Sequence, residues 1–370
     1  MNLKVFLKLI FLISLISACA MIDNKKQAFT PDVKINYEYL QQADFIDIVY
    51  ENDSFSYISY LKEEPALSLY RKSFSCLDED SELPFKKSIW IWKFNEVIGK
   101  EEKIITEIKK LNFKRIYIQI DDNIEKLLYF LELARSNNIE IFAVDGDPYY
   151  IHNAENLKNR IKKVIAFNQK MNYFAGFQID VEPYLFKDFN LNKQSYLEKY
   201  VSLIKSLKEL TEGRLKFSIV IPFWFDDVYY KNRPLSFEII DLADEIVVMS
   251  YRTALAEILQ VASDELCYAS VVNKPVYLAL EINPLPVEEH FLVKKETVEE
   301  NLIKDNTEYY LRKLPSSGLP VFRSYKVKPE NLTFYNNPKI KEILNIRVKK
   351  KSFSGWVIHS FEGLKERLLE

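Results

Sequence analysis

Glycine is scarce in this chain: 7 of its 370 residues are glycine, fewer than its 14 prolines. A nucleotide-binding fold needs clustered glycines so that the backbone can approach a phosphate, and neither G-x-G-x-x-G nor G-x-x-x-x-G-K-[ST] occurs. The sequence therefore disfavours dinucleotide-binding folds and P-loops. We expect Gly146, Gly176 and Gly355 to mark strands or strand ends where the backbone packs closely.

Histidine, cysteine and net charge are also low. The three histidines and three cysteines show no metal-ligand spacing, so the sequence predicts no metal site and implies no cofactor. A formal net charge of −2 supplies no basic field for nucleic acid. The chain is instead 48% hydrophobic and carries 25 Phe and 23 Tyr, which is enough for a full core and excludes a disordered or fibrous class.

The first residues have the pattern of an export signal. Lys4 and Lys8 lie in or beside an apolar run from Val5 to Ile16, which is too short to span a membrane and ends in small residues. We therefore predict a signal peptide over residues 1–18.

The segment Ile16-Ser17-Ala18-Cys19 resembles a bacterial lipobox, whose cysteine is diacylated and becomes the first mature residue. Ordinary secretory cleavage near Ala18 or Ala20 is the alternative. The lipobox implies a lipoprotein with a membrane anchor at Cys19, located in the bacterial cell envelope at the outer membrane or cell surface. In an exported protein Cys76 and Cys267 have two options, a disulfide or two separate thiols, and their spacing leaves both open.

Short apolar runs alternate with segments of helical periodicity along the rest of the chain. The eight expected strands are Ser88–Phe94, Arg115–Ile120, Glu140–Val144, Phe174–Val181, Lys216–Ile221, Glu245–Ser250, Pro275–Leu280 and Gly355–Ser360. The helical segments are Lys100–Leu111, Ile124–Asn137, Ala154–Met171, Lys193–Thr211, Phe237–Ala243 and Ala254–Val271.

Eight β units alternating with α units imply parallel pairing, because a parallel connection needs a crossover. The number of units and the length indicate an α/β fold, a (β/α)8 TIM barrel over residues 84–370. A doubly wound open sheet is the alternative, disfavoured because no glycine-rich first turn is present. In a barrel the active site lies at the carboxyl ends of the strands.

Two segments lie outside the regular count. Residues 19–83 form an N-terminal extension in which Asp47–Glu51 and Ser54–Tyr60 predict a hairpin packed on the barrel. Residues from about 286 to 354 form a long insertion before strand eight. There we expect a helix over Thr297–Leu314 and a strand near Val321–Val327.

Strand four carries the strongest chemical signal. Alternation along Phe174–Val181 and into Glu182 places Gln178, Asp180 and Glu182 on one face, which would point into the barrel. Two carboxyl groups on one face interact electrostatically, so one can stay protonated near neutral pH, as a general acid requires. Pairing with barrel arginines or lysines is the structural alternative.

Gly176 to Glu182 is similar to the strand-four signature of family 18 glycoside hydrolases, the chitinase-like barrels. Met249-Ser250-Tyr251 resembles the Met-x-Tyr of that family. The resemblance implies that Glu182 protonates the glycosidic oxygen, that Asp180 orients Glu182 or a substrate acetamido group, and that Tyr251 hydrogen-bonds the substrate. The sequence departs from the family at Ala175 and Gln178, where the pattern has aspartates, and at His359, where a tryptophan is usual.

A second resemblance, to a group of little-characterised bacterial barrel proteins, covers the barrel in order and spacing. It rests on the segments Asp180–Tyr184, Ser250–Thr253 and Gly355–Phe361, and on Glu281 at the end of strand seven. Glu281 has three candidate roles in the site. It is a retaining nucleophile if its carboxyl lies about 5–5.5 Å from that of Glu182, or part of an inverting pair at roughly 6.5–9.5 Å. Alternatively, Arg252 or His359 neutralises it.

Several further residues near strand ends are candidate site residues. His359 shares the parity of Val357 and is expected to line the barrel, either in the site or as a buried imidazole. The other candidates for substrate contact are Arg252, Gln119, Asp145 and Trp224, with Trp90 and Trp92 as possible sugar-stacking rings.

These features predict a surface-tethered glycoside hydrolase that acts on an extracellular or envelope polysaccharide, with Glu182 as general acid assisted by Asp180. The alternative is a degenerate barrel that binds a glycan without turnover, or an envelope accessory lipoprotein.

Overall fold

The structure, a computed structural model, describes residues 33–52, 54–62 and 76–364. The expected signal peptide and the lipidation residue Cys19 lie outside these residues. No helix in the described part of the chain is long and apolar enough to cross a membrane. Two compact units form, one from the described parts of 1–71, 183–196 and 285–329, and the other from those of 72–182, 197–284 and 330–370.

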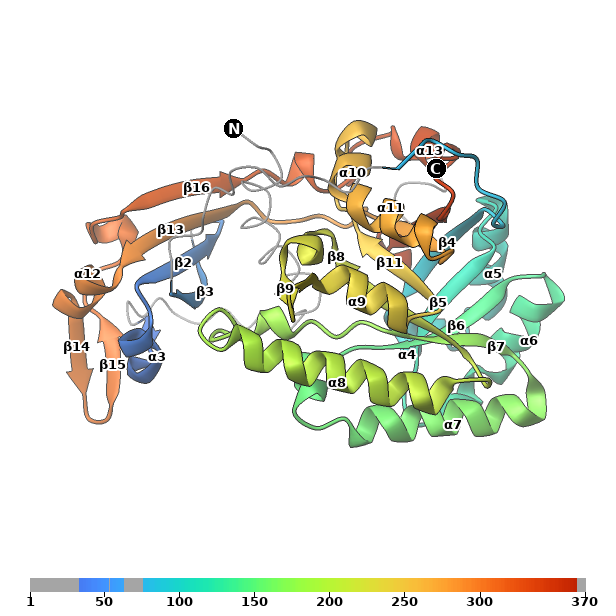
Figure 1. Cartoon of the computed structure of the whole chain (residues 1–370), viewed down its shortest axis with the longest axis horizontal. Coiled ribbons are helices and arrows are strands. Elements are labelled where there is room, and N and C mark those ends of the chain that lie inside the picture. Colours follow the sequence, from blue (N-terminus) through green and yellow to red (C-terminus); the bar gives the residue numbers. More distant parts are fainter. Residues whose placement is uncertain (1–32, 53, 63–75, 365–370) are drawn as a thin grey trace. The chain divides into compact units, whose positions relative to one another are not determined.

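The larger unit is a closed barrel of eight parallel strands (Figure 1). The strands pair in chain order and the last pairs with the first, which confirms the (β/α)8 fold and excludes the open-sheet alternative. All eight expected strands are present, with small shifts of their ends: β4 (Lys86–Ile91), β5 (Arg115–Gln119), β6 (Glu140–Asp145), β7 (Phe174–Ile179), β8 (Lys216–Pro222), β11 (Glu245–Met249), β12 (Val276–Glu281) and β17 (Phe353–His359).

Helices follow the strands as expected and lie outside the barrel (Figure 1). In α5, Ile104, Ile105 and Ile108 form the buried face, acids occupy the first turn and lysines the last, which favours the helix dipole. The principal helices are α5 (Glu101–Lys110), α6 (Leu128–Ser136) after the 3-10 turn η1 (Ile124–Leu127), α7 (Glu155–Met171), α8 (Lys193–Thr211), α9 (Leu235–Leu242), α10 (Leu255–Val261) and α11 (Ser263–Val271).

Asparagine, rather than glycine, ends most of these helical units. Asn112, Asn138, Asn172 and Asn273 all have positive φ, between 51° and 59°, one or two residues after the last residue of α5, α6, α7 and α11. Asparagine tolerates the left-handed conformation that a helix C-terminus requires better than most residues do. After α5 the next amide, of Phe113, donates to the carbonyl of Ile108, which closes the helix end.

Short turns begin at the strand ends that carry proline. The 3-10 turns are η2 (Pro148–Ile151), η3 (Pro183–Leu185) and η4 (Phe223–Asp227). Strand β7 ends at Ile179, earlier than the expected Val181, although the Asp180 amide still donates to the carbonyl of Asp145. Smaller elements of this unit are α4 (Phe94–Val97), β9 (Tyr229–Tyr230), β10 (Arg233–Pro234), α13 (Ile340–Ile343) and α14 (Phe361–Leu364).

Cys76 and Cys267 form a disulfide in the barrel unit, with their Cα atoms 5.2 Å apart. The bond decides between the two options that the sequence left open. It links the segment before the first barrel strand to α11, across 191 residues of sequence.

The smaller unit contains a four-stranded sheet in the order β16-β13-β2-β3. The predicted hairpin is present as β2 (Phe45–Glu51) and β3 (Ser54–Leu61), and the predicted strand near 321–327 as β16 (Arg323–Val327). Strand β13 (Glu288–Lys294) pairs with β2 throughout its length, so the N-terminal extension and the insertion build one sheet. The sequence interpretation treated them as separate segments.

The predicted helix over Thr297–Leu314 is wrong. Only α12 (Lys295–Glu300) is helical, and β14 (Leu302–Asp305) and β15 (Glu308–Leu311) form a hairpin. Asn306 takes a positive φ of 54° in the turn, and β15 also pairs with β1 (Lys34–Ile35). The segment has helical spacing, but it pairs as a strand with residues far away in the sequence. Local periodicity does not detect such a partner.

One face of the four-stranded sheet packs on α3 (Tyr37–Gln42) through an apolar cluster that includes Ile46, Ile48 and Val293. The opposite face carries His290, which lies 2.9 Å from an Asp47 oxygen and 3.5 Å from a Glu288 oxygen. All three polar side chains are buried.

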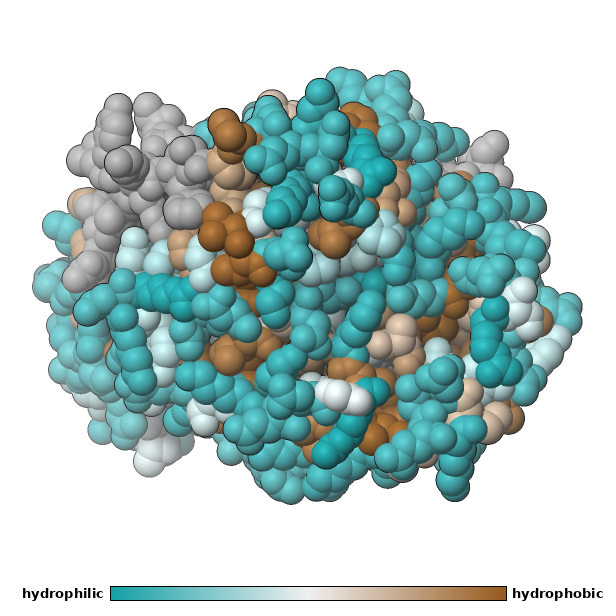
Figure 2. Space-filling view, turned by 45° about the vertical axis from the view of Figure 1, so that its right-hand side comes forward, coloured by the Kyte–Doolittle hydropathy of each residue, from teal (hydrophilic) through white to brown (hydrophobic). Residues whose placement is uncertain are grey.

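Most of the face seen in Figure 2 is hydrophilic, with hydrophobic side chains in separate patches. Individual exposed apolar residues, such as Tyr149 at 67% and Val271 at 68%, are ordinary for a folded surface.

Candidate active site

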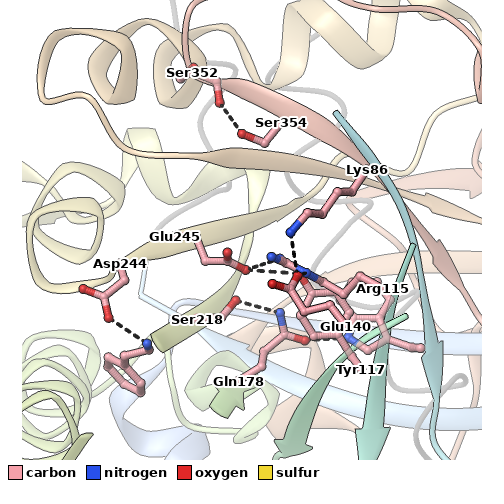
Figure 3. A network of polar contacts seen from close by, with 12 residues as sticks. Lys86, Arg115, Tyr117, Glu140, Gln178, Ser218, Asp244, Glu245, Ser352 and Ser354 are labelled. Carbon is pink, nitrogen blue, oxygen red and sulfur yellow. Dashed lines mark hydrogen bonds and ion pairs between the residues drawn. The ribbon is translucent and has the colours of Figure 1, made fainter. Parts of the chain in front are cut away.

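Gln178 lies in the interior of the barrel, where alternation along β7 predicted it. Its amide oxygen accepts from Trp90 Nε1 at 2.6 Å, and its amide nitrogen donates to Ser218 Oγ at 2.9 Å (Figure 3). Strands β4 and β8 supply these two partners, so the amide joins three strands. Gln178 thus links three strands just before Asp180 and Glu182 in the chain. Trp90 is 1% exposed and is part of the core.

Asp180 and Glu182 follow β7 at the carboxyl end of the barrel. Glu182 is 4% exposed, and the Oδ1 atom of Asp180 is buried without a hydrogen-bond partner among the described residues. Burial raises the pKa of Asp180 to about 6, and the charge of His359 opposes that rise. The carboxyl group of Asp180 therefore changes its charge near pH 6.

Gly146 determines how closely β6 and β7 approach at this level. A Cβ on Gly146 would lie 2.1 Å from the carbonyl oxygen of Asp180, closer than any side chain permits. The backbone that carries Asp180 therefore requires glycine on the neighbouring strand end. A Cβ at Gly176 would meet the Phe142 ring at 2.2 Å, and one at Gly355 would meet the Lys86 carbonyl at 1.8 Å, as the expected close packing implies.

Tyr200 on α8 is a site residue that the sequence interpretation missed. It is fully buried, and its hydroxyl has no partner among the described residues. Burial, followed by the charges of Asp180 and Glu182, raises the pKa of Tyr200 above its usual range, so its hydroxyl stays protonated beside the two acids. In the helical segment Lys193–Thr211, the spacing of Tyr200 is that of an ordinary core position. A phenol in an otherwise apolar stripe was the available signal.

Glu281 ends β12 with both carboxylate oxygens occupied. Oε1 accepts from the backbone amide of Ile282 at 2.9 Å and from the amide and side chain of Asn283, each at 2.7 Å. Oε2 lies 2.6 Å from Nδ1 of His359 on β17. Of the partners proposed from sequence, His359 is therefore the one that binds Glu281, and Asn283 is an additional holder that sequence reasoning missed.

His359 lies in an aromatic cage. Its ring centroid is 5.8 Å from that of Trp90, 6.3 Å from that of Trp92 and 6.0 Å from that of Tyr251. Burial lowers the pKa of His359, but Glu281 and then Asp180 reverse this, with a net rise above its ordinary value. The strand-six tyrosine, the strand-eight histidine and the strand-seven glutamate thus meet at one end of the barrel.

Arg252 is fully buried and has no carboxylate partner within ion-pair distance in the described residues. Its Nη1 donates to the carbonyl of Tyr251 and its guanidinium lies 4.9 Å from the Phe223 ring centroid, while Nε and Nη2 have no partner there. Burial lowers its pKa to about 10. Arg252 therefore does not neutralise Glu281.

The remaining sequence candidates occupy different surroundings. Asp145 is bound by Arg160 at 2.7 Å and by the hydroxyl of Tyr150 at 3.1 Å, so its charge is already paired. Gln119 is partly exposed at the end of β5. Trp224 is 4% exposed and packs edge-on against Phe225, with ring centroids 4.9 Å apart, so it presents little ring face to solvent.

A second polar network closes the amino end of the barrel (Figure 3). Arg115 binds Glu245 at 2.6 Å and also binds Glu140, which Lys86 contacts at 2.7 Å. These side chains come from the first residues of four strands, and Arg115 is 1% exposed. Because polar groups at the amino end of such a barrel contribute to stability, we assign this network a structural role.

The described residues contain no group of three or more His, Cys, Asp or Glu side chains placed to hold a metal ion.

No known protein family matches the chain by its sequence profile. No curated protein matches it in sequence. Solved structures of similar fold include the spore cortex-lytic enzyme SleL of Bacillus cereus, with TM-score 0.43, 9% identity and coverage of 76% of this chain and 72% of that one. A chitinase from Bacteroides thetaiotaomicron has a TM-score of 0.41 and 12% identity, over 76% of this chain and 91% of that one. Human YKL-39, described as a pseudo-chitinase with retained chitooligosaccharide binding, has a TM-score of 0.40 and 13% identity, over 76% of this chain and 93% of that one. Chitinase-like barrels, the family that the strand-four motif resembles, are thus among the structures to which this fold is similar.

Proposed function

We propose that the protein is a glycoside hydrolase that cleaves a glycosidic bond in an extracellular or envelope polysaccharide, with Glu182 as general acid and Asp180 as its partner. The observation that carries the proposal is the position of the two acids directly after β7, with Glu182 buried, Oδ1 of Asp180 buried, and both acids acting electrostatically on the buried hydroxyl of Tyr200. This end of a (β/α)8 barrel holds the active site in essentially every characterised enzyme of the fold.

In the proposed reaction, Glu182 donates its proton to the glycosidic oxygen as the bond between that oxygen and the anomeric carbon breaks. The positive charge that develops on the sugar ring is stabilised by the carboxylate of Asp180, which stays ionised. Glu182 is left as a carboxylate and recovers a proton from the water that attacks the anomeric carbon, either directly or after a neighbouring group of the substrate has displaced the leaving group. Tyr251 contacts the sugar that reacts.

Glu281 is a poor nucleophile in this scheme, because backbone and side-chain N–H groups and His359 occupy both of its oxygens. The attacking group is then water or a neighbouring group of the substrate, such as an acetamido oxygen. The second option is the one that the strand-four resemblance implies. It restricts the substrate to N-acetylated sugars.

Glu182→Gln tests the proposal. The purified chain is incubated with chitooligosaccharides, peptidoglycan fragments and neutral polysaccharides, and reducing ends are counted. We expect wild type to release reducing ends from one class and Glu182→Gln to lose about 10²–10⁴-fold of that rate. Glu212→Gln, an exposed glutamate at the end of α8, is the matched control and should keep full activity. Full activity in Glu182→Gln would refute the assignment.

A glycan-binding protein without turnover is the second candidate, and one observation favours it. Gln178, which stands where the family pattern has an acid, is neutral and fully engaged with Trp90 and Ser218. The same panel separates the two functions, because this candidate predicts saturable binding of a glycan with no reducing ends released.

The location of the protein is also part of the proposal. A lipid anchor at Cys19 would hold the barrel at the bacterial envelope, near an envelope polysaccharide. Metabolic labelling with a palmitate analogue should mark the wild-type chain and leave Cys19→Ala unlabelled. Equal labelling of both would exclude the anchor.

A further inference from the structure

Asp180, directly after β7, has no oppositely charged neighbour along that strand. Gln178, two residues earlier, carries no charge, and its amide group is hydrogen-bonded to Trp90 and Ser218. A buried carboxylate without a counter-charge is costly, and it stays ionised only if a cation lies close by. The cation must therefore come from another strand.

The ring of His359 can supply this positive charge, because Glu281 holds its orientation. Nδ1 is bound to Glu281 Oε2 at 2.6 Å, so any interaction of the ring with Asp180 or a substrate must use Nε2. The cage of Trp90, Trp92 and Tyr251 holds the ring plane, and Asn283 holds Glu281. A ring nitrogen whose partner is fixed has a fixed orientation for the other nitrogen.

We propose that Glu281 and His359 form a positioning pair that supplies the counter-charge of Asp180, with Glu281 holding the imidazolium through Nδ1. His359 makes and breaks no covalent bond in this role. Its catalytic consequence rests on the proposed function: an ionised Asp180 leaves the transferable proton on Glu182.

Few other charged groups face this pair in the described residues. His359 interacts electrostatically with Glu281 from β12, with Asp180 after β7 and with Glu362 from α14. Asp180 and Glu182 both act on Tyr200. The coupling between His359 and Asp180 is therefore measurable without interference from Arg252, whose charge interacts with Glu257 instead.

Histidine NMR tests the pairing without a substrate. The full chain has three histidines, His152, His290 and His359, so ring-labelled protein gives three sets of signals that single His→Gln variants assign. We expect Asp180→Asn to lower the pKa of His359 by about 1 unit or more, because an opposite charge is lost nearby. Asp147→Asn, which keeps the side-chain oxygen that caps η2, is the control and should leave His359 unchanged.

An unchanged His359 titration in Asp180→Asn would overturn the proposal, provided that circular dichroism and thermal unfolding of the variant match those of wild type. If that variant does not fold, the reciprocal experiment decides. Coupling is mutual, so His359→Gln must raise the pKa of Asp180 above about 6, read from carboxyl-labelled aspartate. An unmoved Asp180 there would equally overturn the pairing.

Activity separates this proposal from the proposed function. If Glu182→Gln abolishes hydrolysis, we expect His359→Gln to move the acidic limb of kcat/KM upward by about one pH unit. A uniform loss at all pH values, with no shift, would show a structural role only. If Glu182→Gln stays active, the glycosidase proposal fails, while the NMR coupling is judged by itself.

Discussion

Nδ1 of His359 lies 2.6 Å from Oε2 of Glu281, at the ends of the neighbouring strands β17 and β12. The contact joins the last barrel strand to the one beside it, directly below the loops where a substrate of a (β/α)8 enzyme binds. In the reaction that we propose, this contact disfavours Glu281 as a nucleophile, and Glu182 and Asp180 are the reactive pair.

The first prediction concerns pH. Because burial raises the pKa of Asp180 to about 6, Asp180 is neutral below that pH and ionised above it. If the ionised form is the active one, kcat/KM of wild type rises as the pH increases through about 6. Asp180→Asn should lower kcat by about 10²–10⁴-fold and remove this limb. A pH–rate profile from acid to neutral measures both. An identical limb in Asp180→Asn would assign it to another group.

The second prediction compares two buried arginines. Arg115→Met leaves Glu245, 3% exposed, as an unpaired buried charge, so the free energy of unfolding should fall by about 3–5 kcal/mol. Arg252→Met removes a buried cation that has no carboxylate partner, so the free energy of unfolding should hold or rise by about 1 kcal/mol. Urea denaturation of both variants is the measurement. A loss in Arg252→Met as large as that in Arg115→Met would show that Arg252 has a partner of equal value.

The third prediction concerns Gly146. Gly146→Ala pushes a Cβ against the Asp180 carbonyl, so it should cost about 1–3 kcal/mol and also lower activity by displacing Asp180. Gly99→Ala is the matched control, because Gly99 has a positive φ of 78° and nothing within 4 Å of the added Cβ. It should cost about 1–2 kcal/mol from backbone strain alone and leave activity intact. Equal activities in the two variants would contradict the packing argument.

The fourth prediction concerns His290 in the smaller unit. Asp47 and Glu288 raise its pKa from 6.5 to about 9 in spite of burial. A histidine whose pKa is higher in the folded state stabilises the fold below pH 6.5, and this contribution is lost as the pH rises through 9. Hydrogen exchange of β2 and β13 amides should therefore accelerate over that window, beyond the intrinsic rise. In His290→Gln this extra acceleration should disappear, and its persistence would point to another titrating group.

The barrel was predictable from the sequence because each strand is a short apolar run with its own local pattern. Gln178 also followed from alternation, since a two-residue period fixes its face. The hairpin at β14 and β15 was not predictable in the same way. Tyr310 pairs with Lys34, and no local periodicity reports a partner so far away in the chain.

The candidate site was predictable in composition but less so in its contacts. Their positions at strand ends placed Asp180, Glu281 and His359 at one end of the barrel, yet the sequence left the choice between His359 and Arg252 as the partner of Glu281 open. Tyr200 was missed because a tyrosine on the buried face of a helix has the same spacing as a leucine. Its hydroxyl acquires meaning only once the acids beside it are placed.

The asparagines that end the barrel helices have a consequence for the unfolded chain. A glycine at Asn112, Asn138, Asn172 or Asn273 would adopt the same left-handed turn, but it would also give the unfolded chain more conformations to lose on folding. The use of asparagine at these ends lowers that entropic cost, and glycine is kept for positions such as Gly146 and Gly355, where a Cβ has no room. The scarcity of glycine is thus a way of making the unfolded state less favourable.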